Sequence, residues 1–166
     1  MPITSLQELF IHELSDIYNA EKRLMRDLPR LAGSVHDARL AESLAFHIAE
    51  AGAHVDRIDQ VIETLDVWPR RGRCAAIEAM VEDLLDIVDV IDPGSLRDIA
   101  LLAGIQRLIR HQVAAHGIVV TLARRLDYRD VLPALLHNLD EKTAADERLA
   151  RLAAGSPQQS ASMHAA

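Results

Sequence analysis

The chain has 166 residues, of which 49% are hydrophobic and only 3% aromatic, and its formal net charge is −7 at pH 7. This length supports one domain, and the shortage of aromatic residues favours helices over sheets. The negative charge argues against nonspecific binding to nucleic acid, and no apolar run reaches the roughly 18 residues of a transmembrane helix. A single cysteine, Cys74, precludes an intrachain disulfide. With no evident signal peptide, the sequence predicts a soluble protein of the reducing cytoplasm.

Two long amphipathic helices are expected first. A capping box of Ser5 and Glu8 begins a helix that runs to about residue 31, where Gly33 is expected to supply a left-handed end. Its apolar seam consists of Phe10, Leu14, Ile17, Leu24, Leu28 and Leu31. A second helix is expected over residues 37–65. Its seam consists of Leu40, Leu44, His47, Ala51, His54, Ile58, Ile62 and Leu65, so two histidines are predicted to be buried.

A break at residues 68–72 separates this pair from the rest, and its basic residues Arg70, Arg71 and Arg73 are interpreted as a solvated linker. A shorter amphipathic helix is expected over residues 74–90, before Pro93 and Gly94 interrupt the chain again. This helix has an apolar stripe wider than one bundle face needs, which predicts a homodimer. The stripe consists of Ile77, Met80, Val81, Leu84, Ile87 and Val88.

The last two long helices form a second hairpin. Ser95 with Asp98 is expected to cap a helix that runs to about residue 126. Its seam consists of Ile99, Leu102, Gln106, Ile109, Val113, His116, Val120 and Ala123. After a turn at residues 127–129, the final helix over residues 130–154 tolerates Pro133 in its first turn. Its expected seam consists of Leu132, Leu135, Leu139, Asp146 and Leu149.

Two hairpins joined by a long, partly helical connection are typical of the ferritin-like four-helix bundle, because an up-down bundle needs only short loops. We therefore predict an all-α, ferritin-like four-helix bundle whose long crossover carries an additional shorter helix. The domain is expected to span residues 1–155, and residues 156–166 are expected to form a disordered tail.

Glu21 interrupts the apolar seam of the first helix, where an ionised carboxylate costs several kcal/mol unless it is paired, protonated or bound to a metal. In an antiparallel hairpin, Glu21 lies level with Glu50, and His54 follows Glu50 by about one helical turn. These three side chains are therefore expected to converge. Carboxylates and imidazole together suit a divalent ion such as iron, manganese or zinc. The Glu-x-x-x-His spacing departs from the Glu-x-x-His of dinuclear bundle sites.

The second hairpin supplies fewer candidate metal ligands than the first. Asp146 lies level with Ile109 and is the anion expected there, whereas Ile109, Gln112 and His116 offer no carboxylate. The predicted metal ligands are Glu21, Glu50, His54 and Asp146. The alternatives are that Glu21 pairs with His54 or Arg57, that Glu50 bonds to His54, and that Asp146 pairs with Lys142. His47 is expected to be a core residue and Glu141 to face solvent.

Several segments resemble the YciE/YciF stress-protein family of the ferritin-like superfamily. They are residues 10–22 (FIHELSDIYNAEK), residues 57–61 (RIDQV), Arg73, Cys74, Arg97, Asp98, Ala100 and residues 126–128 (LDY). The resemblance covers about residues 3–153 and implies a ferritin-like bundle, often dimeric, linked to bacterial stress responses, with a suspected dimetal centre and no settled activity.

The resemblance places Glu21, Glu50 and Asp146 at acidic positions of the family, and Glu141 in a frequently acidic pair. Ile109 and Gln112 stand where relatives carry glutamates, which implies a reduced metal site or none. Two functions follow. The first is a stress protein whose reduced carboxylate and histidine site handles iron or peroxide. The second is a non-enzymatic helical module that has lost its centre and acts by self-association or by binding a partner protein.

Overall fold

A computed structural model describes residues 2–69 and 72–155, so the tail predicted for residues 156–166 lies outside the described residues. The described residues form five helices, which are α1 (Leu6–Ala32), α2 (Ala38–Leu65), α3 (Ala75–Val90), α4 (Ser95–Arg125) and α5 (Leu132–Ala153). The bounds agree with the predicted helices to within a few residues. None of these helices is long and apolar enough to cross a membrane.

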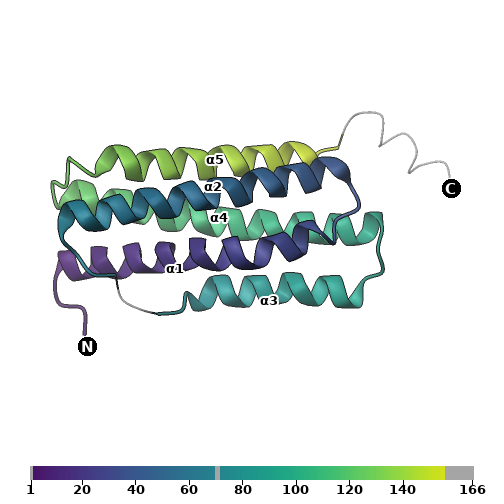
Figure 1. Ribbon diagram of the computed structural model, residues 1–166, viewed down its shortest axis with the longest axis horizontal. Helices are drawn as coiled ribbons and strands as arrows, with labels where there is room; N and C mark the ends of the chain where they lie inside the picture. Colours follow the sequence, from purple (N-terminus) through teal and green to yellow (C-terminus); the bar gives the residue numbers. More distant parts are fainter. Residues whose placement is uncertain (1, 70–71, 156–166) are drawn as a thin grey trace.

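Helices α1, α2, α4 and α5 form a bundle, and helix α3 lies on its outside (Figure 1). Helix α1 packs against α2 and α4, and α5 completes the ring by packing against the same two helices. Helix α3 packs against α1 and α4. The prediction of an all-α, ferritin-like four-helix bundle with a crossover helix is confirmed.

The caps of the first hairpin follow the sequence except at Gly33. Ser5 Oγ accepts a hydrogen bond from the Glu8 amide at 3.1 Å, and Glu8 in turn accepts from the Ser5 amide at 3.2 Å. Asp37 caps α2 through the amides of Arg39 and Leu40. The left-handed stop predicted at Gly33 is wrong. Gly33 has φ −68°, because its amide continues the helical pattern by bonding the Pro29 carbonyl at 3.1 Å.

The cap predicted for α4 is also wrong, because Asp98 serves a different element. Helix α4 begins after Gly94, and no side chain caps it. The buried Asp98 carboxylate instead accepts hydrogen bonds from the amides of His36 and Asp37, at 2.9 and 2.6 Å. It therefore satisfies two loop donors and ties the start of α4 to the turn between α1 and α2.

The buried apolar residues form two clusters, and the predicted seam of α1 contributes to both and is buried throughout. The predicted seam of α4 is wrong at its start, where Ile99 is 60% exposed. Leu101, Ile105 and Leu108 are buried in its place, because this end of α4 packs against α3 as well as α1. Three residues of the α3 stripe, Ile77, Val81 and Leu84, are used in that packing. The stripe is therefore largely covered within the chain, and the homodimer stays a prediction.

Candidate functional site

Glu21 lies fully buried at the middle of α1, and each of the other three bundle helices directs a basic or imidazole side chain at it. Lys142 Nζ of α5 lies 2.8 Å from Oε1 and 3.0 Å from Oε2. His116 Nε2 of α4 is 3.1 Å from Oε1, and His54 Nδ1 of α2 is 3.4 Å from Oε2. The carboxylate therefore has a partner from each helix of the bundle.

Lys142 was missed by the sequence analysis, although a signal for it exists. The buried residues of α5 are Leu135, Asn138, Lys142, Ala145 and Leu149, and they repeat at spacings of three and four. This is the regular seam of a helix in a bundle, and Lys142 lies at its centre. The predicted seam followed Leu139 and Asp146 instead, and lysine is a residue that is seldom fully buried.

Electrostatics keep Glu21 ionised. Burial by itself raises the pKa of a carboxyl group, but the Lys142 ammonium and the hydrogen bonds from His116 and His54 outweigh it. The pKa of Glu21 is therefore held well below its ordinary value of 4.5. Burial lowers the pKa of His116, so its neutral ring donates an N–H to Glu21. Glu21 and Lys142 are thus a buried ion pair, and the imidazole rings of His54 and His116 lie beside it.

A second acidic residue joins this network through His54. His54 Nε2 lies 3.0 Å from Glu141, whose carboxylate also accepts hydrogen bonds from Arg57 at 2.6 and 3.2 Å. Asn138 accepts from Arg57 at 2.7 Å and donates to the His54 carbonyl at 3.3 Å. Glu141, which was expected to face solvent, is 26% exposed, but its carboxylate also joins the network because Arg57 and His54 bind it.

Glu50 makes its contacts away from this network. Its carboxylate accepts from Arg148 at 2.7 Å, and His47 Nδ1 lies 3.5 Å away. Burial lowers the pKa of His47 to about 4, so that contact is not an ion pair at neutral pH. Neither ring nitrogen of His47 has a hydrogen-bond partner. Of the three side chains expected to converge, the structure brings Glu21 and His54 together, whereas Glu50 binds Arg148.

Asp146 lies at the level predicted for it but points outward. It accepts a hydrogen bond from Arg110 at 3.0 Å and lies 3.5 Å from the amide nitrogen of Gln106. Its side chain is 27% exposed. The alternative in which Asp146 pairs with Lys142 is wrong, because Lys142 is turned inward toward Glu21.

Three glutamates described above are each neutralised by a cation of the chain itself. The pairs are Glu21 with Lys142, Glu50 with Arg148, and Glu141 with Arg57. A divalent ion beside Glu21 does not fit this arrangement, because the ammonium group holds both oxygens and would repel a second cation. Among the described residues, no three His, Cys, Asp or Glu side chains are placed to share a metal ion. Ligation by Glu21, Glu50, His54 and Asp146 stays a prediction.

Comparison with known proteins agrees with the fold. The sequence profile of DUF892, a domain of unknown function, matches residues 5–162. The chain belongs to the DUF892 family. Protein YciF of Escherichia coli (strain K12) is 34% identical to this DUF892 protein over 154 residues, which are 92% of this chain and 93% of YciF.

Two solved structures extend the likeness to three dimensions. The E. coli stress protein YciF superposes with a TM-score of 0.88 at 34% identity, over 91% of this chain and 96% of that chain. YcfI from Rhodopseudomonas palustris, for which a structural role is suggested, gives 0.84 at 28% identity, over 89% and 94%. The resemblance of this DUF892 protein to the YciE/YciF family, predicted from its motifs, is confirmed.

Proposed function

We propose that this DUF892 protein is a bacterial stress-response protein of the cytoplasm that acts through protein contacts, by self-association or by binding a partner. In this proposal the bundle centre is a structural ion-pair network. The observation that carries the proposal is the position of Lys142 Nζ, 2.8 and 3.0 Å from the two oxygens of Glu21. The likeness to the E. coli stress protein YciF supports the link to stress.

The chemistry of the network supports a structural role. A dinuclear carboxylate site uses metal ions to offset the charge of its glutamates. Here the cations of Lys142, Arg57 and Arg148 offset the charge of the glutamates. Ile109 and Gln112 of α4 add no carboxylate to the centre. Filling the centre with the chain's own cations removes the need for an ion while keeping the buried carboxylates paired.

Metal content is the direct test. We would express the protein without chelators and measure bound metals by mass spectrometry, with the Glu21→Ala, Glu50→Ala double variant as the reference. We expect negligible metal in both samples and a melting temperature that a chelator leaves unchanged. Stoichiometric metal in the wild-type protein, lost in the double variant and accompanied by a chelator-sensitive melting temperature, would overturn the structural role.

The second candidate is the reduced metal site. One observation favours it, since two imidazoles, of His54 and His116, already converge on Glu21. If Lys142 turned away, these three side chains would hold a single divalent ion such as iron, manganese or zinc, which would supply redox handling of iron or peroxide. The metal analysis above separates the two candidates.

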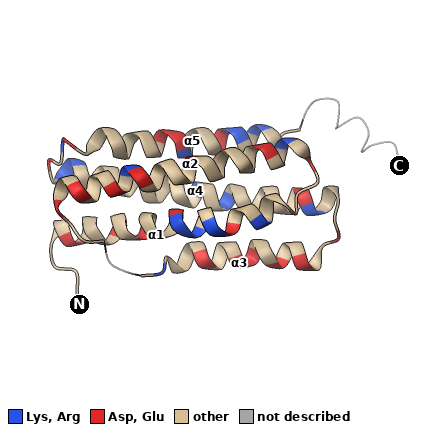
Figure 2. Ribbon diagram, viewed as in Figure 1, with Lys and Arg blue, Asp and Glu red and all other residues tan. Residues whose placement is uncertain are grey.

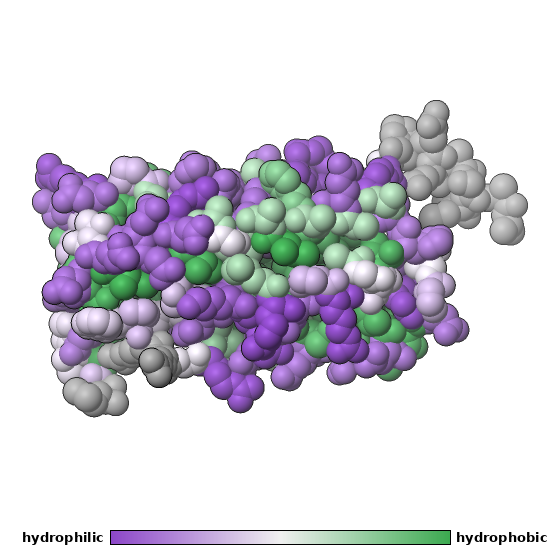
Figure 3. All heavy atoms as spheres, in the orientation of Figure 1, coloured by the Kyte–Doolittle hydropathy of each residue, from purple (hydrophilic) through white to green (hydrophobic). Residues whose placement is uncertain are grey.

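A homodimer is the simplest form of self-association, and an apolar area supports it. Figure 3 shows apolar side chains gathered over the first half of α2 and the adjoining part of α1. In these helices Phe46 is 53% exposed and Met25 is 41% exposed. Exposed apolar side chains that are grouped in this way commonly mark a protein contact.

Sedimentation of three proteins tests the dimer. We expect the wild-type protein to sediment as a dimer and Phe46→Ser to shift toward monomer. Trp68→Ser is the matched control, because Trp68 is 83% exposed in the segment after α2 and its loss should leave the dimer unchanged. A monomeric wild-type protein, or a dimer that Phe46→Ser does not weaken, would contradict self-association through this face.

A further inference from the structure

A cavity of about 430 Å³ lies where the middle of α1 meets the segment that leads into α3. Four cationic side chains, Lys22, Arg23, Arg26 and Arg73, line it. Figure 2 shows that cations gather on this part of α1, although α3 beside it is mainly acidic. For a chain with a net charge of −7, this is a local reversal of sign.

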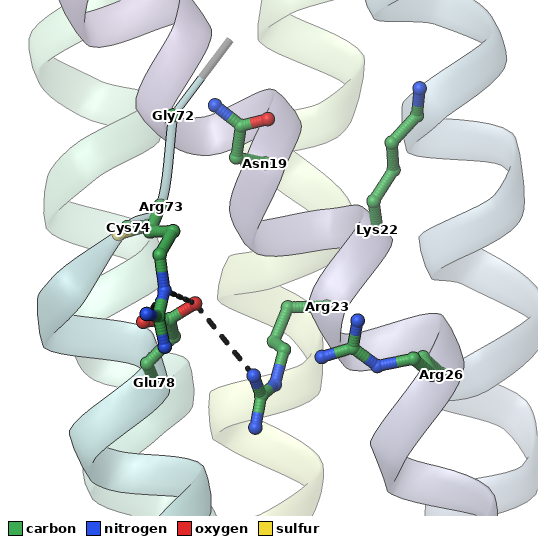
Figure 4. A pocket seen from close by; sticks show the side chains of 8 residues that line it. All are labelled: Asn19, Lys22, Arg23, Arg26, Gly72, Arg73, Cys74 and Glu78. Atoms are coloured by element: carbon green, nitrogen blue, oxygen red, sulfur yellow. Dashed lines mark hydrogen bonds and ion pairs between the residues drawn. The ribbon is translucent and has the colours of Figure 1, made fainter.

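An ordered chain of ion pairs builds the cavity. Arg73 Nε lies 2.8 Å from Glu78, and Arg23 Nη1 lies 3.7 Å from the same carboxylate. Arg23 also pairs with Asp27, which in turn pairs with Arg26 at 3.0 Å. Figure 4 shows Glu78 between Arg73 and Arg23, with the Arg26 side chain next to Arg23. Three guanidinium groups are therefore held in place by only two carboxylates.

The positive charge that these two carboxylates leave unpaired lies at the exposed walls of the cavity. Arg23, Asp27 and Glu78 form a floor whose side chains are 16 to 19% exposed, whereas Arg26 and Arg73 are 65% and 76% exposed. The outer two guanidinium groups thus keep donors available to solvent while one of their edges is fixed by an acid. The interpretation of the basic residues before α3 as a linker is therefore incomplete at Arg73. Arg70 and Arg71 lie outside the described residues.

Lys22 also lines the cavity, but Figure 4 shows its side chain pointing away from the three guanidinium groups. Its ammonium group donates to the Tyr18 hydroxyl at 2.7 Å and lies 4.0 Å from the centre of the Tyr18 ring. The Tyr18 hydroxyl in turn donates to the Asp59 carboxylate at 2.7 Å, so an acidic residue lies close to this ammonium group. The surplus of positive charge at the cavity therefore comes from the guanidinium groups of Arg23, Arg26 and Arg73, which outnumber the two carboxylates that pair with them.

We propose that this cavity binds the phosphate group of a small phosphorylated molecule. Guanidinium groups recognise phosphate through parallel hydrogen bonds, and groups already oriented by carboxylates lose little freedom on binding. The volume exceeds what a single phosphate needs, so it admits further atoms of the ligand. No aromatic side chain lines the cavity among the described residues. A second phosphate or a sugar therefore fits better than a base that needs a stacking surface.

Calorimetric titration of the full chain at low salt tests this proposal. The probes are sodium pyrophosphate, inorganic phosphate and glucose 6-phosphate, and their relative affinities distinguish a polyphosphate from a sugar phosphate as the source. We expect saturable binding of pyrophosphate or glucose 6-phosphate that exceeds binding of inorganic phosphate. The Arg26→Gln variant should bind about tenfold more weakly, because one charge-assisted hydrogen bond is lost. Its unchanged melting temperature would confirm folding.

The matched control is Arg151→Gln, which removes the same charge from an exposed residue of α5 that also has one acidic neighbour, Glu147 at 3.8 Å. This variant should bind the probes like the wild-type protein. Equal weakening in both variants would mean that only overall charge matters, and would overturn the site. Absence of binding by any of the three probes would also overturn it. Neither result depends on the metal analysis, because the cavity lies outside the bundle centre.

Discussion

The ion pair between Glu21 and Lys142 joins two helices that face each other diagonally across the bundle. Helices α1 and α5 both pack against α2 and α4, and the pair spans the space between them. His54 of α2 and His116 of α4 complete the other diagonal, with ring centres 6.0 Å apart. All four helices thus meet at one carboxylate, which fixes their register at the centre of the fold.

Loss of Lys142 should therefore be costly. We expect Lys142→Met to lower the free energy of unfolding by about 3–5 kcal/mol, because it leaves the buried Glu21 carboxylate without a cation. Changing Glu21→Leu in the same chain should recover at least half of that loss, because no unpaired charge then remains. Urea denaturation of the two single variants and the double variant measures this coupling. Additive losses would contradict the ion pair, and Lys22→Met on the surface should change stability by less than about 0.5 kcal/mol.

His47 should make the protein less stable in mild acid. Burial, reinforced by the Lys142 charge, lowers the pKa of His47 to about 4, whereas the unfolded residue titrates near 6.5. Between pH 6.5 and 4, His47 is therefore protonated in the unfolded chain but not in the folded protein. The free energy of unfolding is highest above pH 6.5 and decreases as the pH falls from 6.5 to 4. The expected loss over this window is about 3 kcal/mol. His116, whose pKa is also lowered, acts in the same direction.

Urea denaturation at several pH values checks this slope. His47→Leu should flatten it markedly, whereas His36→Gln, at an exposed histidine, should leave it unchanged. Glu21 contributes at lower pH, since its depressed pKa means that its stabilisation is present above 4.5 and is lost as the pH falls below that value. A slope between pH 6.5 and 4 that His47→Leu leaves undiminished would contradict the contribution of His47.

The sequence predicts this fold well because helix periodicity, caps and loop lengths act locally. It placed Glu21 and His54 in the core and Asp146 at the correct level, because those conclusions need only a seam and a turn. The partners of these side chains could not be predicted in the same way. Whether the buried Glu21 faces an ammonium group or a metal ion depends on which face of α5 is turned inward. Asp146 would bring a negative charge to the centre, whereas Lys142 brings a positive one.

Asp98 shows the same limit at a helix end. Its place near a helix start predicts a cap, but the amides that it satisfies belong to His36 and Asp37, more than sixty residues earlier. We expect Asp98→Ala to lower the free energy of unfolding by about 1.5–3 kcal/mol, because two charge-assisted hydrogen bonds are lost. Hydrogen exchange should show lost protection at these two amides. Unchanged protection would mean that the carboxylate does not hold the loop.

Two glycines of α4 should respond in opposite directions to the same substitution. A Cβ added at Gly104 would lie 2.6 Å from Leu84 Cδ2 of α3, and Leu84 is buried, whereas nothing lies within 4 Å of a Cβ at Gly117. Alanine favours a helix interior by up to about 1 kcal/mol over glycine, so Gly117→Ala should stabilise the protein. Gly104→Ala gains the same helix propensity, but the added methyl group forces α3 away from α4, at a cost of about 1–3 kcal/mol. Urea denaturation should rank Gly104→Ala below Gly117→Ala, and the reverse order would show that α3 is not packed closely on α4.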